Sequence, residues 1–163
     1  MSIKVVLGLG SNLGDRQQYL LKALERIETT IGRISRKSAL YETVSWGFSA
    51  EEKFLNQVII TETELSPAEV LKQILQIESE CGRVRQHGSD YTSRTLDIDI
   101  LYFGDLIISE DDLVIPHPRL ENRKFVLLPL VETDPEFVHP VLKKTNRMLL
   151  MECTDNLDVK FYE

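Results

Sequence analysis

Two aspartates stand one residue apart inside an apolar stretch, residues 93–104, of this 163-residue sequence. Alternate side chains of a β-strand point to opposite faces, so Asp97 and Asp99 would share one face while Leu96 and Ile98 occupy the other. The two aspartate Cα atoms would lie roughly 7 Å apart, twice the rise per residue, so their carboxylates could converge on one ligand. Two like charges at that spacing repel unless a cation lies between them. The pattern therefore predicts a strand with an acidic face suited to a cation.

The alternative is a strand whose two aspartates only make one face polar and solvent-exposed, without binding a ligand. An isolated Asp-x-Asp pattern favours that alternative. Aspartate is a poor strand former, however, so two of them among leucine, isoleucine and aromatic residues need a local reason. Carboxylates that bind hard metal ions, beside cations that bind phosphate, are the equipment of phosphoryl transfer. The sequence supplies such cations and imidazoles near the strand: Arg83, Arg85, His87, Arg94, His117, Arg119 and Arg123.

The length and charge of the chain limit the classes of function. We expect one domain over residues 1–163, because this length is enough for a single hydrophobic core. The formal net charge of -7 argues against a nucleic-acid partner, since general affinity for phosphate backbones needs a basic surface. Any phosphate site must therefore be local.

The two cysteines, Cys81 and Cys153, form no close-spaced pair and no Cys/His pattern, so neither a disulfide scaffold nor a zinc site is expected. We predict buried thiols in a reducing compartment. The first residues lack the order of a signal peptide, and no apolar run is long enough to span a bilayer. The sequence therefore predicts a cytoplasmic protein without membrane contact.

Hydrophobic periodicity predicts the elements that position the aspartates. A serine cap with proline at the next position and glutamate three residues after the serine marks the start of one helix. The resulting order, βαββαβ, is that of the ferredoxin-like α+β fold, in which two helices lie on one face of an antiparallel sheet. This fold hosts many functions and cannot choose among them. Strands are expected over residues 3–9, 34–41, 54–63 and 95–103, and helices over residues 17–31 and 67–81.

The connections and the C-terminal part are less regular. Residues 10–15 are expected to form a turn with a helix cap at Asn12 or Asp15, since the Walker lysine and the dinucleotide glycine spacing are absent. Two long loops, residues 42–53 and 83–93, are of a kind that is often functional. Further along we expect a hairpin from residues 106–109 and 113–115, short helices over 119–122, 125–131 and 146–152, and an edge strand over 157–162.

Three groups of residues together resemble the 6-hydroxymethyl-7,8-dihydropterin pyrophosphokinases of folate biosynthesis. They are residues 93–100, residues 8–12, and Pro116-His117 followed by Asn122-Arg123 and Phe125. Each motif alone is weak, but their combination in this order and spacing is specific. The resemblance covers most of the chain, to about residue 135.

The resemblance implies transfer of a pyrophosphoryl group from ATP to the hydroxymethyl oxygen of the pterin, with release of AMP. It also implies two Mg²⁺ ions at Asp97 and Asp99, which the strand geometry suggests independently. The ions would neutralise the triphosphate and hold the attacking oxygen in line with the β-phosphorus. Four residues match family positions that contact ATP or the migrating phosphates: Arg85, Arg94, His117 and Arg123. The resemblance also implies a part in catalysis for Arg85 and Arg94. Each of the four could instead be a surface ion-pair partner.

The same resemblance implies a pterin site. Phe54 and Phe125 match aromatic residues that hold the flat pterin, although from the residues alone both would be assigned to the core. Asn56 matches an asparagine that binds the ring edge, and a buried amide in a strand needs partners in any case. Glu78 matches an acidic position that would either support the site or be exposed. The first long loop adds Thr43, Val44 and Trp46.

Two rival functions fit part of the same pattern. One is a non-catalytic ferredoxin-like module that binds a metal or nucleotide, and the other is a phosphoryl transferase acting on a different small alcohol. Aromatic pterin contacts and cations in one cleft would argue against the first, because a metal sensor needs neither. ATP and the hydroxymethyl pterin are the expected partners, and we expect the chain to act as a monomer.

Overall fold

The computed structural model describes residues 1–43, 53–82 and 95–162 of the chain. The two remaining internal stretches, 44–52 and 83–94, cover most of the first predicted long loop and all of the second, together with Arg94. Several predicted residues therefore lie outside the described part of the chain: Val44, Trp46, Arg83, Arg85, His87 and Arg94.

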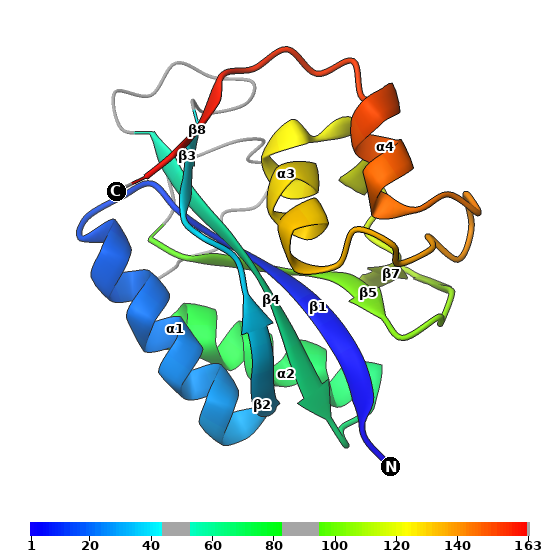
Figure 1. Cartoon of the computed structure of the whole chain (residues 1–163). Coiled ribbons are helices and arrows are strands. Elements are labelled where there is room, and N and C mark those ends of the chain that lie inside the picture. Colours follow the sequence, from blue (N-terminus) through cyan, green and yellow to red (C-terminus); the bar gives the residue numbers. More distant parts are fainter. Residues whose placement is uncertain (44–52, 83–94, 163) are drawn as a thin grey trace.

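Six strands of the described residues form one antiparallel sheet (Figure 1). Its order is β5-β1-β4-β3-β8, and β2 also pairs with β4. The order β5-β1-β4-β2 agrees with the predicted ferredoxin-like core. The bounds are β1 (Ile3–Ser11), β2 (Gly32–Lys37), β3 (Tyr41–Thr43), β4 (Phe54–Thr63), β5 (Asp97–Phe103) and β8 (Val159–Phe161).

Helices α1 (Arg16–Thr30) and α2 (Pro67–Glu80) cover one face of the sheet, as predicted (Figure 1). The Asp15 carboxylate accepts a hydrogen bond from Gln18 N at 3.2 Å, which decides between the two predicted caps of α1. Ser66 Oγ accepts from Glu69 N at 3.2 Å and caps α2. Apolar side chains from both helices and from β1, β4 and β5 form the first core cluster, which includes Leu96, Ile98 and Ile100.

The opposite face carries α3 (Lys124–Thr133) and α4 (Asn146–Glu152), with the 3₁₀ turn η1 (Leu120–Asn122) before α3. A second core cluster joins these elements to the sheet. Leu101 and Tyr102 both belong to this cluster because the β1–β5 register shifts between Val6 and Leu7, leaving Leu101 as an extra residue. The predicted hairpin is β6 (Ile108–Glu110) and β7 (Leu113–Ile115).

Some predicted boundaries were wrong. The strand expected to end at residue 9 continues through Gly10 and Ser11, because both residues pair with β4. The strand expected over residues 34–41 is two strands, β2 and β3, separated by a break. In this break Ser38 N donates a hydrogen bond to Val58 O, and Ser38 Oγ accepts one from Val58 N. Cys153 is half-buried rather than buried, and both cysteines are free.

Candidate active site

The predicted site residues lie in rows across the sheet. Asp97 pairs with Gly10, Gly10 with Asn56, and Asn56 with Tyr41. Residues directly opposite one another in antiparallel strands point to the same face, so this row spans four strands on one face. Asp99 pairs with Gly8 in the next row on that face. The strand register thus brings the aspartate pair and Asn56 together, roughly 10 Å apart across two strand spacings.

Gly10 allows the polar side chains to approach each other. A Cβ atom at this position would lie 3.2 Å from Asn56 Oδ1 and 3.8 Å from Cδ1 of Phe54. Contacts of 3.2 Å are tighter than most side chains accept, so an alanine would push Asn56 away. Sequence reasoning had assigned Gly10 to a turn and missed this role, because the register was not visible in the local pattern.

Asn56 is buried, and its amide nitrogen has no hydrogen-bond partner within the described ranges of the chain. A buried donor left unpaired costs about 1–3 kcal/mol, so such a group calls for a partner such as a water, an ion or a bound ligand. Ser11 Oγ and Thr95 Oγ1 are also buried without a hydrogen-bond partner among the described residues. Ser11 follows Gly10 and Thr95 precedes the aspartates, so both lie at the same end of the sheet as Asn56, with Ser11 on the opposite face of β1 from Gly10. Ser11 and Thr95 lie within the motifs 8–12 and 93–100, but sequence reasoning had given neither of them a role of its own.

Glu78 anchors the aspartate strand from the helix side. Its side chain is buried, and Oε2 accepts a hydrogen bond at 2.8 Å from the backbone N–H of Ile98, the residue between Asp97 and Asp99. Of the two predicted alternatives, the exposed one is therefore wrong. The carboxylate holds the backbone of the Asp-x-Asp segment on the side away from the two aspartate side chains.

His117 faces the aspartates from the segment before η1. Its Nε2 lies 3.9 Å from Asp99 Oδ2, and its Nδ1 accepts a hydrogen bond from Arg119 N. Burial lowers the pKa of His117 to about 4, helped by the positive charges of Arg123 and Arg119 and opposed by Asp97. At neutral pH the imidazole is uncharged, and because Nδ1 accepts, the proton is on Nε2, facing Asp99.

The aromatic candidates stand on two different elements. Phe125 is in the first turn of α3, and the guanidinium carbon of Arg123 lies 5.6 Å from its ring centre. Phe54 begins β4 and pairs with Thr43 of β3. Both rings are half-buried rather than enclosed in the core. The structure thus places Phe54, Asn56 and Thr43 on the adjacent strands β3 and β4, and Phe125 with Arg123 at the start of α3. We call these two groups of residues the walls of the candidate pterin site.

The donor set fits Mg²⁺ better than a transition metal. Two carboxylates on one strand face offer hard oxygen ligands, and Mg²⁺ commonly takes only one or two carboxylates and completes its shell with water and substrate phosphates. Within residues 1–43, 53–82 and 95–162, no group of three or more His, Cys, Asp or Glu side chains could hold a metal without such partners. In the same ranges no helix is long and apolar enough to cross a membrane.

The chain resembles known proteins over most of its length. The family model described as 7,8-dihydro-6-hydroxymethylpterin-pyrophosphokinase matches residues 6–135. The chain is 43% identical over 140 residues to a 2-amino-4-hydroxy-6-hydroxymethyldihydropteridine pyrophosphokinase of Aquifex aeolicus, covering 86% of both chains. It is 41% identical over 138 residues to a protein of the same name in Porphyromonas gingivalis, covering 83% of this chain and 93% of that one.

Longer proteins contain a similar segment. A folic acid synthesis protein of Dictyostelium discoideum is 43% identical over 147 residues, and the match covers 90% of this chain but 22% of that protein. The solved structure of Plasmodium falciparum HPPK-DHPS has a TM-score of 0.75 at 20% identity, covering 93% of this chain and 45% of that chain. The chain therefore spans less than half the length of these larger proteins, and the structural likeness supports the fold.

Proposed function

The chain belongs to the 7,8-dihydro-6-hydroxymethylpterin-pyrophosphokinase family, and we propose that it transfers the pyrophosphoryl group of ATP to 6-hydroxymethyl-7,8-dihydropterin. In this reaction the hydroxymethyl oxygen forms a bond to the β-phosphorus, while the bond between that phosphorus and the oxygen bridging to the α-phosphorus breaks. The products are the pterin pyrophosphate and AMP, and the reaction is a step of folate biosynthesis.

The observation that carries this proposal is the row Asp97–Gly10–Asn56. It places a carboxylate pair suited to metal-bound phosphates and an amide suited to a heterocycle edge on one sheet face, two strands apart. A module that only senses a metal has no use for the buried, unpaired amide of Asn56. A substrate with phosphate chemistry at one end and hydrogen-bonding ring atoms at the other uses both.

Asp97 and Asp99 would hold Mg²⁺, and we extend the proposal to two ions because the two carboxylates and a triphosphate offer enough oxygen donors. Mg²⁺ bound there supplies charge neutralisation of the triphosphate and a fixed direction of attack. Glu78 keeps the two carboxylates in place through Ile98 N. His117, with Nε2–H facing this region and its imidazole neutral, can donate a hydrogen bond to a phosphate oxygen.

Positive charge around the phosphates would come from arginines. Arg123 is joined to His117 through η1, because Arg123 N donates to Leu120 O and Leu120 N donates to His117 O, both at 3.3 Å. We propose that it contacts ATP, and that Arg85 and Arg94, outside the described ranges, meet the charge that develops during transfer. Only an interaction that strengthens in the transition state raises kcat.

The pterin would lie between the aromatic walls. Phe54 and Phe125 provide flat apolar surfaces, and Asn56 provides hydrogen bonds to the ring edge. Thr43 is buried and pairs with Phe54 on one side and Val159 on the other, and we propose that it contributes to the pterin contacts. Val44 and Trp46, outside the described ranges, complete the proposed pterin contacts.

The test is incubation with Mg²⁺, ATP and the hydroxymethyl pterin, followed by chromatography of the nucleotides. We expect AMP in a one-to-one ratio with pterin pyrophosphate, and no AMP when the pterin is omitted. ADP in place of AMP would contradict pyrophosphoryl transfer and favour simple phosphorylation. Binding of both ligands without any nucleotide product would favour the non-catalytic module.

A further inference from the structure

The residues that follow α4 lie beyond residues 6–135, which the family model matches, and they contact both proposed walls of the pterin site. In Figure 1 this red segment runs from α4 past the beginning of α3 to the edge of the sheet. We name residues 154–162 the C-terminal strap. Its two ends make different kinds of contact.

The first end of the strap caps α3. Asp155 Oδ2 accepts a hydrogen bond from Lys124 N at 3.0 Å, and Oδ1 accepts from Leu157 N at 3.0 Å. The residue at the N-cap position of α3, Arg123, makes no side-chain cap hydrogen bond. A carboxylate at a helix N-terminus satisfies an amide that has no partner within the helix and interacts favourably with the helix dipole. Asp155 therefore fixes the turn that carries Arg123 and Phe125.

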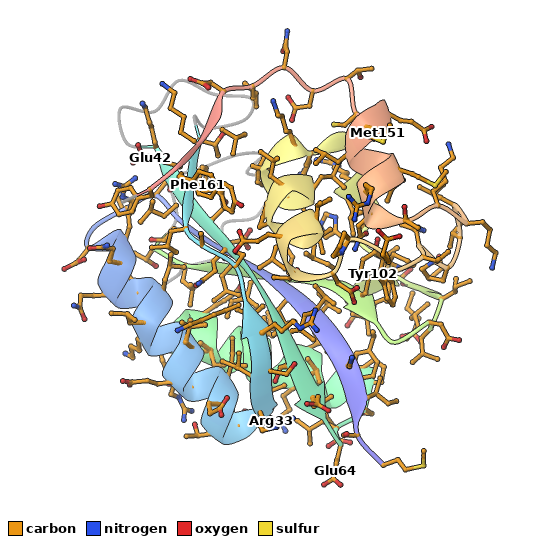
Figure 2. The ribbon with its side chains drawn as sticks, in the orientation of Figure 1. Arg33, Glu42, Glu64, Tyr102, Met151 and Phe161 are labelled. Carbon is orange, nitrogen blue, oxygen red and sulfur yellow. The ribbon has the colours of Figure 1, made fainter. Side chains whose placement is uncertain are left out.

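The second end of the strap extends the sheet. In β8, Phe161 pairs with Tyr41 and Val159 pairs with Thr43. The Phe161 and Tyr41 ring centres are 5.0 Å apart, and Tyr162 N donates to Leu40 O at 2.9 Å. Figure 2 shows Phe161 beside β3. Tyr41 pairs with Asn56, and Thr43 pairs with Phe54. The strap therefore stabilises β3, the strand that lies beside the proposed pterin-site residues of β4.

Arg16 joins the strap to the base of the same wall. Its guanidinium lies 5.5 Å from the centre of the Tyr162 ring, and Nη1 donates to Glu42 Oε2 at 3.0 Å and to Lys53 O at 2.6 Å. Glu42 and Lys53 stand on either side of the β3–β4 pair formed by Thr43 and Phe54. Arg16 and the strap thus connect β3, the start of β4 and the C-terminal residues of the chain.

We propose that the C-terminal strap sets the spacing between the two walls of the pterin site, with Asp155 and Phe161 as positioning residues. The inference rests on the proposed function, because it assigns a task to the site described above. Among the described residues the strap forms no strand pairing and no hydrogen bond with β1 or β5, the strands that carry Gly10 and the aspartates, although Tyr162 packs against the core cluster to which both strands contribute. It therefore acts on the binding of pterin and, through Arg123, on that of ATP, rather than on the bonds made and broken in the transfer step.

The test compares Asp155→Ala, Phe161→Ala and the double variant with the wild type. Matched controls are Asp158→Ala and Lys160→Ala, because these two residues pair with each other and are exposed on the same segment. Pterin affinity is measured by titration in the presence of a non-hydrolysable magnesium nucleotide, and kcat at saturation of both substrates. Each single variant should bind pterin about fivefold more weakly, a size set for Asp155→Ala by the loss of a helix cap and for Phe161→Ala by the loss of the ring contact with Tyr41, with kcat within twofold of wild type.

The double variant decides whether the two ends act together. If the strap sets the spacing, breaking either end releases it, so the double variant should bind pterin no more weakly than the weaker single variant. Independent effects of the two ends would multiply to about 25-fold, and that result would overturn the proposal. Pterin affinity within twofold of wild type in both single variants would also overturn it.

Two further measurements keep the outcomes separate. Asp155→Asn retains an acceptor oxygen and should recover most of the pterin affinity, whereas failure to recover despite a wild-type melting temperature would count against the cap. Wild-type protein must form AMP in the same assay. If it does not, the proposed function fails. If it does and the variants bind pterin normally, the strap alone is withdrawn.

Discussion

Two acidic pairs of the same spacing stand at opposite ends of the sheet. Asp97 and Asp99 lie on β5 opposite Gly10 and Gly8, near the end of β1. Glu62 lies on β4 opposite Lys4, near the start of β1, and Glu64 follows the end of β4. Both pairs have the pattern acid-x-acid, so the local sequence alone does not say which one binds a ligand.

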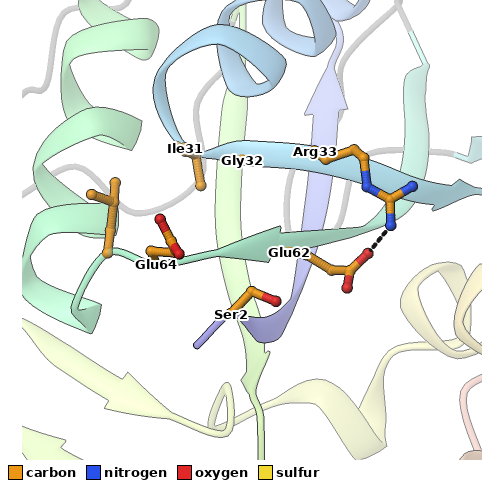
Figure 3. Close-up of a pocket in the computed structure, with 7 residues that line it drawn as sticks. Ser2, Ile31, Gly32, Arg33, Glu62 and Glu64 are labelled. Atoms are coloured by element: carbon orange, nitrogen blue, oxygen red, sulfur yellow. Dashed lines mark hydrogen bonds and ion pairs between the residues drawn. The ribbon is translucent and has the colours of Figure 1, made fainter.

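The residues across the strands make the difference. Glu62 has a basic residue on each side, Lys4 on β1 and Arg33 on β2, and its carboxylate forms an ion pair with Arg33 (Figure 3). The surrounding hollow, of about 470 Å³, is lined by this pair together with Ser2, Ile31, Gly32, Glu64 and Leu65. At the other end, the cross-strand neighbours of the aspartates are glycines. An acidic pair thus becomes a candidate site when its neighbours make room for other polar groups.

The largest expected effect tests this comparison directly. Asp97→Asn and Asp99→Asn should each lower the rate of AMP formation on the order of a thousandfold, because each removes a charge that holds the metal-bound triphosphate. Their folds should survive, and melting temperatures without Mg²⁺ should be unchanged or slightly higher, since the mutual repulsion is relieved. Rates under saturating substrates and thermal melts measure the two effects.

The matched controls are Glu62→Gln and Glu64→Gln, which make the same chemical change at the other end of the sheet. Both should keep AMP formation within twofold of wild type. Full activity in either aspartate variant, or a comparable loss in either glutamate variant, would remove the distinction between the two pairs.

Local pattern was enough to predict much of this arrangement. The alternation of Asp97, Ile98 and Asp99 fixed the faces of β5, because side chains of a strand must alternate. The cap at Ser66 followed from residue chemistry that acts within one turn. The βαββαβ order then followed from the sequence of elements, and the family resemblance selected the aspartates as site residues.

What sequence reasoning missed depends on pairing between distant segments. The role of Gly10 arises only when β1 lies between Asp97 and Asn56, and the bulge at Leu101 arises from the β1–β5 register. The burial of Glu78 depends on where α2 meets β5. An edge strand near the C-terminus was predicted, but its partner β3 was not, because a three-residue strand carries little information about its neighbour.

The second prediction contrasts two glycines. A Cβ at Gly32 would lie 1.9 Å from the backbone oxygen of Glu62, so Gly32→Ala must separate β2 from β4. We expect a loss of unfolding free energy of about 3 kcal/mol or more, measured by denaturant titration. Activity per folded molecule should be unchanged, because this pairing is at the far end of the sheet from Asp97.

Gly10→Ala should behave in the opposite way. Its Cβ would meet the end of the Asn56 side chain, which can shift at little cost to the fold. Pterin affinity should fall about tenfold while the unfolding free energy changes by less than about 1 kcal/mol. A large loss of stability in Gly10→Ala with normal pterin affinity would mean that Gly10 serves packing, as Gly32 does.

The third prediction concerns the support beneath the aspartates. Glu78→Ala removes the acceptor of Ile98 N and should cost about 1–3 kcal/mol of unfolding free energy, together with a lower kcat. Glu78→Gln keeps an acceptor oxygen and should recover most of both. Glu80→Ala is the control on the same helix, since Glu80 is exposed and pairs with Arg26. A Glu78→Ala variant with reduced stability but wild-type kcat would show that Glu78 supports the fold without positioning the aspartates.

The smallest expected effect is at the far acidic pair. The Arg33 side chain is 71% exposed and that of Glu62 is 27% exposed, so water and salt screen much of their attraction. Glu62→Gln should therefore lower the unfolding free energy by less than about 1 kcal/mol, and 1 M salt should reduce the difference further. Denaturant titrations at low and high salt, with Arg33→Gln as the reciprocal variant, measure the pair. A loss of unfolding free energy well above 1 kcal/mol that persists in 1 M salt would mean that the Glu62 carboxylate is bound firmly by its neighbours. The cross-strand neighbours would then not explain why only the aspartate pair is a candidate site, and the explanation would have to come from the chemistry of the aspartates.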